Sequence, residues 1–297
     1  MKHTKPRKHL LYFRYPYFAL GLFGVLIAVL ATSPAPTQAA LNLPDPAYFG
    51  ELERADCSFI SGYAYDENAP DGTISVDIYD NGVLLATVPA DRFRRELFDA
   101  GWPNPYHGFL FPTPSSAKNG KIHQITVNFS GTGIGLFGSP KFIACNASLF
   151  PTATPVTTAS GQGSTWEQGV EFSSSMNGIV TKVRFWRADD EPVGGHYARI
   201  WSTSGTQLIQ AAPFNEVPTP GWQYATVNFP ITAGTHYRVS YNIHNVVAKT
   251  FNVFTNGPIT KGPLTAWASY YSTPAGSFPS SHSSSNLFAD IIFNAPR

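Results

Sequence analysis

The stretch FPITAGTHYRVSYN, residues 229–242, shows the pattern that decides the fold. Apolar residues alternate with other residues before the turn at 232–235, and they alternate again from Tyr237 to Tyr241. A period of two is typical of a strand with one buried face and one face in water. We therefore expect two strands flanking a tight turn. The face expected in water carries His236, Arg238, Ser240 and Asn242.

The same kind of pattern recurs along a chain that is poor in charge and rich in turn residues. Of 297 residues, 25 are Gly and 25 are Pro, and only 13% are charged. Many short strands joined by turns produce this composition, whereas long solvated helices do not. The uncharged, Pro- and Thr-rich segment 149–164 has the composition of a linker. We predict an all-β protein with two β-sandwich domains, at 40–148 and 165–297, of which the second is jelly-roll-like.

The first 39 residues have the order of parts of a secretory signal peptide. A basic flank, Lys2–Arg14, precedes the apolar run 17–31, and small residues then precede Ala40. The apolar run is shorter than the ~20 residues that a membrane span needs. An uncleaved membrane anchor stays open as the alternative. In both cases we expect the domains outside the membrane, with a secreted or extracellular location and no membrane span after cleavage.

Charge and cysteine content narrow the class of partner and the compartment. Residues 40–297 carry 15 basic and 19 acidic side chains, a net charge of −4. A nucleic-acid partner would require a basic surface, so we exclude one. Cys57 and Cys145 are the two cysteines of the chain. In an oxidising compartment we expect them to form a disulfide that closes the first domain.

The first domain contains a predicted hairpin and the best helical stretch of the exported part. The hairpin spans 73–90 with a turn at Asp80-Asn81-Gly82, and the helix lies within ADRFRRELFDAG, 90–101. This order of parts, followed by HGF at 107–109, resembles a small module of bacterial exported and surface proteins. The resemblance implies no activity.

The second domain resembles the bacterial family called domain of unknown function 4082. The matching marks are VRFW at 183–186, GH at 195–196, IWSTSG at 200–205, GWQ at 221–223 and ITAGTHYRVSY at 231–241. The resemblance covers about 165–294. It implies a jelly-roll fold in a secreted, multi-modular protein and suggests carbohydrate binding, without supplying an established ligand or site. One departure is Arg238, at a position that is commonly small in the family.

Aromatic residues beside arginines are the candidate ligand-binding surface. Strand alternation places Trp186 on the face of its strand that carries Arg184, and Trp201 on the face that carries Arg199. Flat rings next to hydrogen-bond donors suit a sugar, although the same residues can simply pack. The segment TAWASYYSTPAG, expected as a loop, is a second possible binding edge. The candidates are Trp186, Tyr197, Arg199, Trp201, Trp267, Tyr270 and Tyr271.

The sequence gives little support for a metal site or for a catalytic site. Glu171 and Asp290, in the first and last strands, are weak candidates for a structural Ca²⁺ of the kind that many jelly-roll modules hold, and we expect no other cofactor. The motifs of serine hydrolases, zinc peptidases and phosphate loops are missing from the sequence. The acidic run 189–191 is interpreted as a solvated turn.

We therefore expect a non-catalytic protein that binds carbohydrate or a cell-surface polymer through its second domain. The alternative is a structural or adhesive surface protein whose modules act as spacers or protein-binding units. An undetected glycan-active enzyme is a third possibility.

Overall fold

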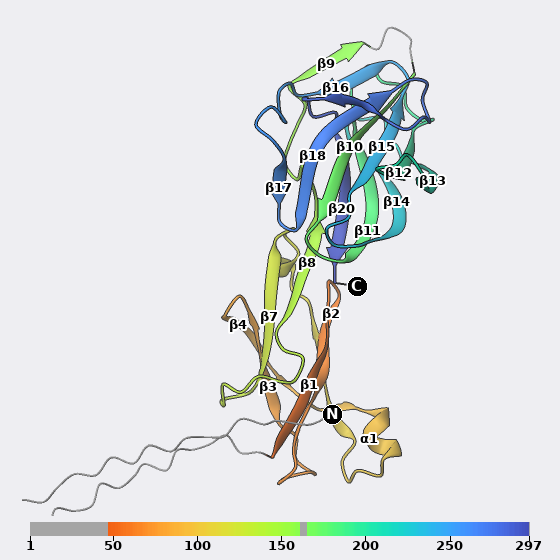
Figure 1. Cartoon of the computed structure of the whole chain (residues 1–297). Coiled ribbons are helices and arrows are strands. Elements are labelled where there is room, and N and C mark those ends of the chain that lie inside the picture. The colour runs from red at the N-terminus through yellow and green to blue at the C-terminus, as the bar shows by residue number, and fades with distance from the viewer. Residues whose placement is uncertain (1–46, 161–164, 297) are drawn as a thin grey trace, which may run out of the picture. The chain divides into compact units, whose positions relative to one another are not determined.

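The computed structural model describes residues 47–160 and 165–296. Leu43–Arg297 forms one compact unit, in which nearly all regular structure is antiparallel strand (Figure 1). The predicted all-β class is therefore confirmed. The predicted signal segment, 1–39, lies outside the described residues. Among the residues described, no helix is long and apolar enough to cross a membrane.

The first sandwich packs two four-stranded layers around its own core. One layer has the order β1-β2-β6-β5, and the other β8-β7-β3-β4. Buried side chains from both layers, including Leu52, Ile78 and Ile125, form the core between them. The strands are β1 (Tyr48–Ala55), β2 (Phe59–Asp66), β3 (Ser75–Asp80), β4 (Val83–Pro89), β5 (Arg92–Phe93), β6 (Tyr106–Pro112), β7 (Ile122–Phe129) and β8 (Lys141–Ala147).

The local predictions for this sandwich hold. β3 and β4 form the expected hairpin, and its turn residues Asn81 and Gly82 have φ values of 49° and 83°. Such left-handed conformations are what Asn-Gly supplies in a two-residue hairpin turn. The predicted helix is α1 (Arg95–Asp99), which contains no buried residue. A short 3-10 helix, η1 (Ser115–Ala117), precedes β7.

The second sandwich has a larger core between two antiparallel sheets. One sheet has the order β13-β12-β15-β10-β18-β17, and the facing one includes β14-β11-β20. The strands are β10 (Trp166–Ser174), β11 (Gly178–Arg187), β12 (Tyr197–Ser202), β13 (Gln207–Pro213), β14 (Gly221–Ile231), β15 (Tyr237–Ile243), β17 (Ile259–Lys261), β18 (Leu264–Ser272) and β20 (Ala289–Ala295). β19 (Ser281–Ser283) pairs with β18, and β16 (Val246–Lys249) pairs with β9 (Thr157–Ser160).

A segment of the second sandwich differs from the sequence prediction, because β18 occupies most of TAWASYYSTPAG, which was expected to be a loop. Residues 251–256, which follow β16, form turns. β18 lies within the sheet because β10 pairs with it along nearly its whole length on one side, and β17 and β19 pair with it on the other. Apolar and polar residues alternate only weakly along β18, which consists largely of small and aromatic residues. A bulge opposite Glu171 also shifts the register of the strand.

The opening stretch crosses from one layer of the second sandwich to the other. β14 belongs to the sheet with β11, and β15 pairs with β10 and β12 in the facing sheet. The turn at 232–235 is therefore a corner between sheets. The Gly234 amide, at a φ of 75°, donates to the Ser174 carbonyl, and the Thr232 amide donates to the Tyr237 hydroxyl.

β8 belongs to both sandwiches. It pairs with β7 through residues 141–144 and with β20 through Ala144 and Ala147, so one seven-stranded sheet, β14-β11-β20-β8-β7-β3-β4, runs through both. The segment expected as a linker, 149–164, follows directly. Leu149 and Phe150 are buried in the second core, and 157–160 form β9. The composition of this segment did not predict these contacts, because Pro and Thr occur in edge strands and in segments packed on a sheet as well as in linkers.

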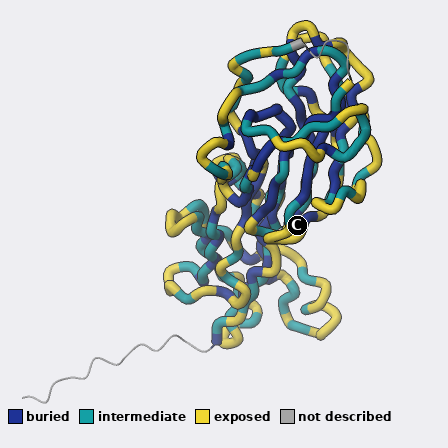
Figure 2. The backbone as a smooth tube through the Cα atoms, turned by 45° about the horizontal axis from the view of Figure 1, so that its top comes forward, coloured by how far each residue is buried: buried dark blue, intermediate teal, exposed yellow. Residues whose placement is uncertain are grey.

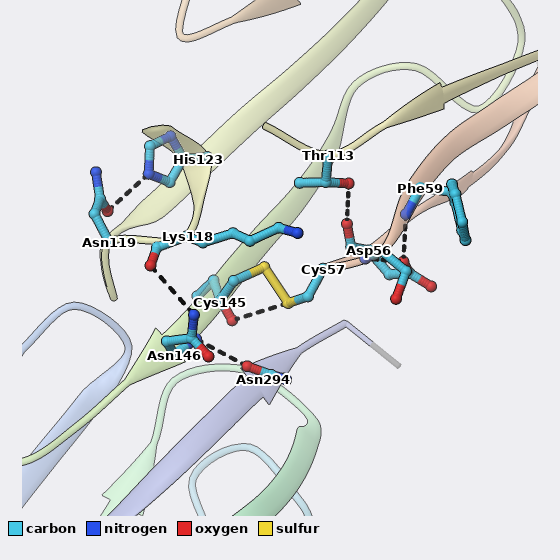
Figure 3. The surroundings of a disulfide bond; sticks show 12 residues. Asp56, Cys57, Phe59, Thr113, Lys118, Asn119, His123, Cys145, Asn146 and Asn294 are labelled. Carbon is cyan, nitrogen blue, oxygen red and sulfur yellow. Dashed lines mark hydrogen bonds between the residues drawn. A yellow bond between two sulfur atoms is a disulfide. The ribbon is translucent and has the colours of Figure 1, made fainter. Parts of the chain in front are cut away.

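Cys57 and Cys145 form the predicted disulfide, with the two Cα atoms 5.5 Å apart (Figure 3). It joins the residues just before β2 to the shared strand β8. The adjoining Asp56 accepts hydrogen bonds from the Ser58 and Phe59 amides, and the Asp56 carbonyl accepts one from the Thr113 hydroxyl. The burial pattern in Figure 2 follows the strands of both sandwiches, with the exposed residues concentrated in the connections.

Candidate functional site: the Trp186 groove

Trp186 is held on the outer face of the sheet that β11 shares with β14 and β20. On β11, Val183 and Phe185 point into the core and Trp186 points away from it. The indole packs edge-on against Trp222, with ring centroids 5.5 Å apart, and against Phe288 at 6.3 Å. These contacts fix the ring, which remains partly exposed. Its N–H has no hydrogen-bond partner among the described residues and is not sealed from solvent.

The exposed part of this ring lines a hollow of about 580 Å³, which we call the Trp186 groove. It is lined by Pro155, Val156, Thr157, Thr158, Trp186, Ala188, Asp189 and Pro220. Asp189 is exposed, and its carboxylate has no hydrogen-bond or ion-pair partner among the residues described. The groove therefore offers a fixed aromatic ring, a free indole donor and a free carboxylate acceptor.

The arginine beside this site is not available to a ligand. Arg184 was expected on a wet face, but it is only 6% exposed. Its Nη2 lies 2.7 Å from the carboxylate of Asp290, and its guanidinium lies 4.0 Å from the ring centroid of Trp222. Asp290 also accepts from the Leu149 and Phe150 amides. The chain that leaves β8 thus covers this part of the sheet.

Tyr197, Arg199 and Trp201 lie on the other sheet of the sandwich, so they do not join Trp186 in one surface. β12 pairs with β15, and its outward residues face away from the β11 sheet. Trp201 is 4% exposed, and its indole N–H donates to the Ser240 hydroxyl at 2.7 Å. It is a packed residue beneath Phe278. Tyr197 is 40% exposed.

Arg199 is held by a carboxylate that has no exposed surface. Its Nη1 lies 2.9 Å from Glu167, which also accepts from the Ser240 hydroxyl and the Gly276 amide. Burial raises the pKa of the Glu167 carboxyl above its usual value, and the hydrogen bonds and Arg199 only partly oppose this shift. The loop that contains Gly276 covers the network, so Arg199 stabilises the fold here.

The three aromatics of β18 have different surroundings. Trp267 is 40% exposed, stacks on His236 at 4.7 Å and donates from its indole to Ser173. The ring of Tyr270 lies 3.4 Å beneath the Arg238 guanidinium. Tyr271 packs against Trp166 at 5.5 Å.

The face of β15 that was expected in water is mostly buried. Ser240 and Asn242 are 0% and 5% exposed, and Arg238 is 9% exposed. Arg238 donates to Glu171 and to the Pro279 carbonyl. The loop after β18 covers this face, which alternation within β15 could not reveal. Only His236 keeps substantial exposure, with 36% of its side chain open.

The weak calcium candidates are not brought together. Glu171 points outward from β10, whose neighbouring residues Val170 and Phe172 are in the core, and Asp290 points outward from β20 in the facing sheet. Their side chains therefore lie on opposite outer faces of the sandwich. Each is bound by an arginine. Within the described parts of the chain, no group of three or more His, Cys, Asp or Glu could hold a metal ion.

Sequence reasoning missed a buried cluster around His196. Its Nε2 lies 2.9 Å from Glu191 and its Nδ1 lies 2.9 Å from Glu216. Glu191, expected in a solvated turn, is 2% exposed and accepts the amides of residues 244–246. Although burial alone would raise the pKa of Glu191, these bonds together with His196 lower it. No local pattern around His196 signals this burial, because its partners Glu191 and Glu216 are separated from it in the sequence.

One comparison with known proteins bears on this half of the chain. Residues 152–289 match the family described as domain of unknown function (DUF4082). The resemblance seen in the sequence of the second domain is therefore confirmed. No curated protein matches the chain.

The DUF4082 segment contains every residue that lines the Trp186 groove. It begins in the covering chain after β8 and ends at Ala289, the first residue of β20. It does not include β8, the strand that pairs with β20.

Proposed function

We propose that the chain is a secreted, non-catalytic binding protein that binds carbohydrate in the Trp186 groove. The observation that carries the proposal is the pairing of a fixed, partly exposed indole with the unpaired carboxylate of Asp189 in one hollow. A sugar ring presents C–H groups that pack on an aromatic face, and hydroxyl groups that donate to a carboxylate.

The form of the groove supports a preorganised site. Trp222 and Phe288 hold the indole before any ligand arrives, so binding does not have to order that side chain. The hollow of about 580 Å³ is within the usual range for small-molecule sites. Strand β9 contributes Thr157 and Thr158 to the lining of the hollow.

The disulfide supports the extracellular location, because such bonds persist in oxidising compartments. We propose that the carbohydrate is part of a cell-surface polymer that exposes its sugar rings. The structural or adhesive alternative has its own support in the first sandwich, where Phe137 and Phe98 are 78% and 59% exposed. Such apolar side chains fit a protein partner.

The test is binding of the purified chain to a panel of immobilised polysaccharides and soluble oligosaccharides. We expect saturable binding to at least one of them. Asp189→Asn should weaken it about tenfold, since one charge-assisted hydrogen bond is lost. Trp186→Ala should weaken it at least as much.

The matched control is Asp190→Asn, which removes the same charge from the next residue, outside the groove. It should leave binding unchanged. Binding that is lost in Trp267→Ala but kept in Trp186→Ala would place the site on the opposite sheet and contradict the proposal. The absence of binding across the panel would favour the structural or adhesive role.

A further inference from the structure

The first sandwich has a second groove, on the outer face of the sheet formed by β1, β2, β6 and β5. Tyr63 and Tyr65 point outward from β2, because Ile60 and Ala64 point into the core. On β1, Glu51 lies directly opposite Tyr63, and Phe49 lies directly opposite Tyr65. Directly opposed residues of an antiparallel pair share a face. The register therefore gathers aromatic rings and a carboxylate on one surface.

The segment that follows α1 supplies the wall of this groove. Gly101, at a φ of 73°, ends the helix, and the Trp102 amide donates to the Leu97 carbonyl. The chain then returns so that the Trp102 ring meets Tyr65 edge-on, with centroids 4.6 Å apart. His107 lies behind both rings, fully buried. The hollow between helix segment and sheet measures about 350 Å³, and we call it the Glu51 groove.

The Glu51 groove carries more negative than positive charge. Its lining includes three carboxylates, Glu51, Glu53 and Glu96, and one guanidinium, Arg94. Arg94 binds Glu53 through two hydrogen bonds of 2.6 and 2.7 Å, and its Nε lies 3.3 Å from Glu96. The carboxylate of Glu51 has no hydrogen-bond or ion-pair partner among the described residues. A ligand therefore meets a free carboxylate and a cation whose donors are already engaged.

Tyr63 responds to this charge. Burial raises the pKa of Tyr63 above its usual value, and the carboxylates of Glu51 and Glu53 raise it further, although Arg94 opposes them in part. A site that disfavours a phenolate would also disfavour an anionic ligand.

The groove already holds one cation against an aromatic ring. The Arg94 guanidinium lies 5.1 Å from the ring centroid of Tyr63, within the range of a cation–π contact. Among the described residues, no such cation lies over the neighbouring rings of Tyr65 and Trp102, and Glu51 lines the same hollow. Aromatic walls with a carboxylate are the combination that recognises organic ammonium groups.

We propose that the Glu51 groove binds a small organic ammonium group, either a quaternary ammonium or a protonated amine. The cation would lie in the hollow against the contacting rings of Tyr65 and Trp102, with the Glu51 carboxylate as counter-ion. This site is separate from the Trp186 groove and does not depend on the sugar proposal.

The test is a calorimetric or NMR titration of the purified chain with choline, and with its neutral carbon isostere 3,3-dimethyl-1-butanol. The two have nearly the same shape and differ in charge. We expect saturable binding of choline and binding of the isostere at least about tenfold weaker. N-acetyl-lysinamide, which carries a protonated amine, serves as the third probe, and its affinity relative to choline identifies the preferred source of the ammonium.

Glu51→Gln keeps the shape of the side chain and should weaken choline binding at least about fivefold. Asp91→Asn removes the same charge from an exposed residue outside the groove and should leave the affinity unchanged. Circular dichroism of both variants verifies folding. Equal affinities for choline and its isostere, unchanged binding in Glu51→Gln, or saturable binding to neither ammonium probe would overturn the proposal. A neutral sugar that binds here in place of the ammonium probes would overturn it too.

Discussion

Arg184 and Asp290 form the most enclosed ion pair on the outer face of the β11 sheet. Their side chains are 7% and 0% exposed, and the carboxylate also accepts hydrogen bonds from the Ser148 hydroxyl and three backbone amides. A buried pair of this kind gives little net stability by comparison with an apolar pair, but the loss of one partner leaves the other charge buried and unpaired. Here it also fixes the path of the chain from β8 into the second sandwich.

We expect Asp290→Ala to lower the free energy of unfolding by about 3–5 kcal/mol, because Arg184 would be left without its counter-ion. Asp190→Ala, at an exposed position, should change it by less than about 0.5 kcal/mol. Urea denaturation of the two variants and the unmodified chain measures the difference. Similar values for both variants would show that the ion pair does not hold this segment.

Two buried glutamates should give stability opposite dependences on pH. Glu167 has a raised pKa, so the folded state retains its proton while the unfolded state has lost it, and stability falls as pH rises through that window above the ordinary value of 4.5. Glu191 has a lowered pKa, so it contributes stability above 4.5 that is lost as pH falls through the folded-state value.

Glu167→Gln and Glu191→Gln separate these effects. From about pH 4 to about pH 7, the stability of Glu167→Gln relative to the unmodified chain should increase, and that of Glu191→Gln should decrease. Urea denaturation at several pH values gives both curves. Parallel curves for the two variants would contradict the assigned directions.

At the scale of elements, the sequence predicted the strands better than their surroundings. Alternation correctly gave the inward residues of β12 and β15, since a period of two follows from strand geometry. On β11 it was correct for Val183 and Phe185 but wrong for Val180, which also points into the core because the register shifts directly after it. It could not tell that β11 and β12 join different sheets, which is why Trp186 and Trp201 were wrongly placed in one surface. Sheet membership depends on pairing between distant segments.

The alternation of apolar and polar residues along a strand also cannot show whether a loop covers the outward face of that strand. Trp201 and Arg238 point outward as predicted, yet the loop around Phe278 and Pro279 covers both. The Trp186 groove was predictable only as a single aromatic candidate, because its other wall comes from the segment 155–158. The Glu51 groove arises from the register of β1 with β2, which the sequence does not specify.

At the scale of the whole molecule, β8 and the disulfide couple the two sandwiches. β8 carries Cys145 and pairs with β7 on one side and β20 on the other. We expect both sandwiches to unfold in one cooperative transition. Removal of the disulfide by Cys57→Ala/Cys145→Ala should destabilise the chain by about 4–5 kcal/mol in the chain-entropy model, given the separation of 88 residues.

Hydrogen exchange followed by mass spectrometry measures this separately for peptides of each sandwich. Peptides from β2 and from β15 should lose protection together in the cysteine-free variant. Unchanged protection of β15 beside a destabilised β2 would show that the sandwiches unfold independently.

The sheet that continues through β8 has a consequence for avidity. Two sites joined by a flexible linker sample many separations, and the effective concentration of one site near a ligand bound at the other depends on linker length. Here a shared strand replaces such a linker, and we expect it to restrict the spacing between the Trp186 and Glu51 grooves to a narrow range. A polymer whose sugar and ammonium groups match that spacing would be bound far more tightly than either group alone, and a polymer with another spacing would gain nothing. The molecule would then select its ligand by the length of its repeat.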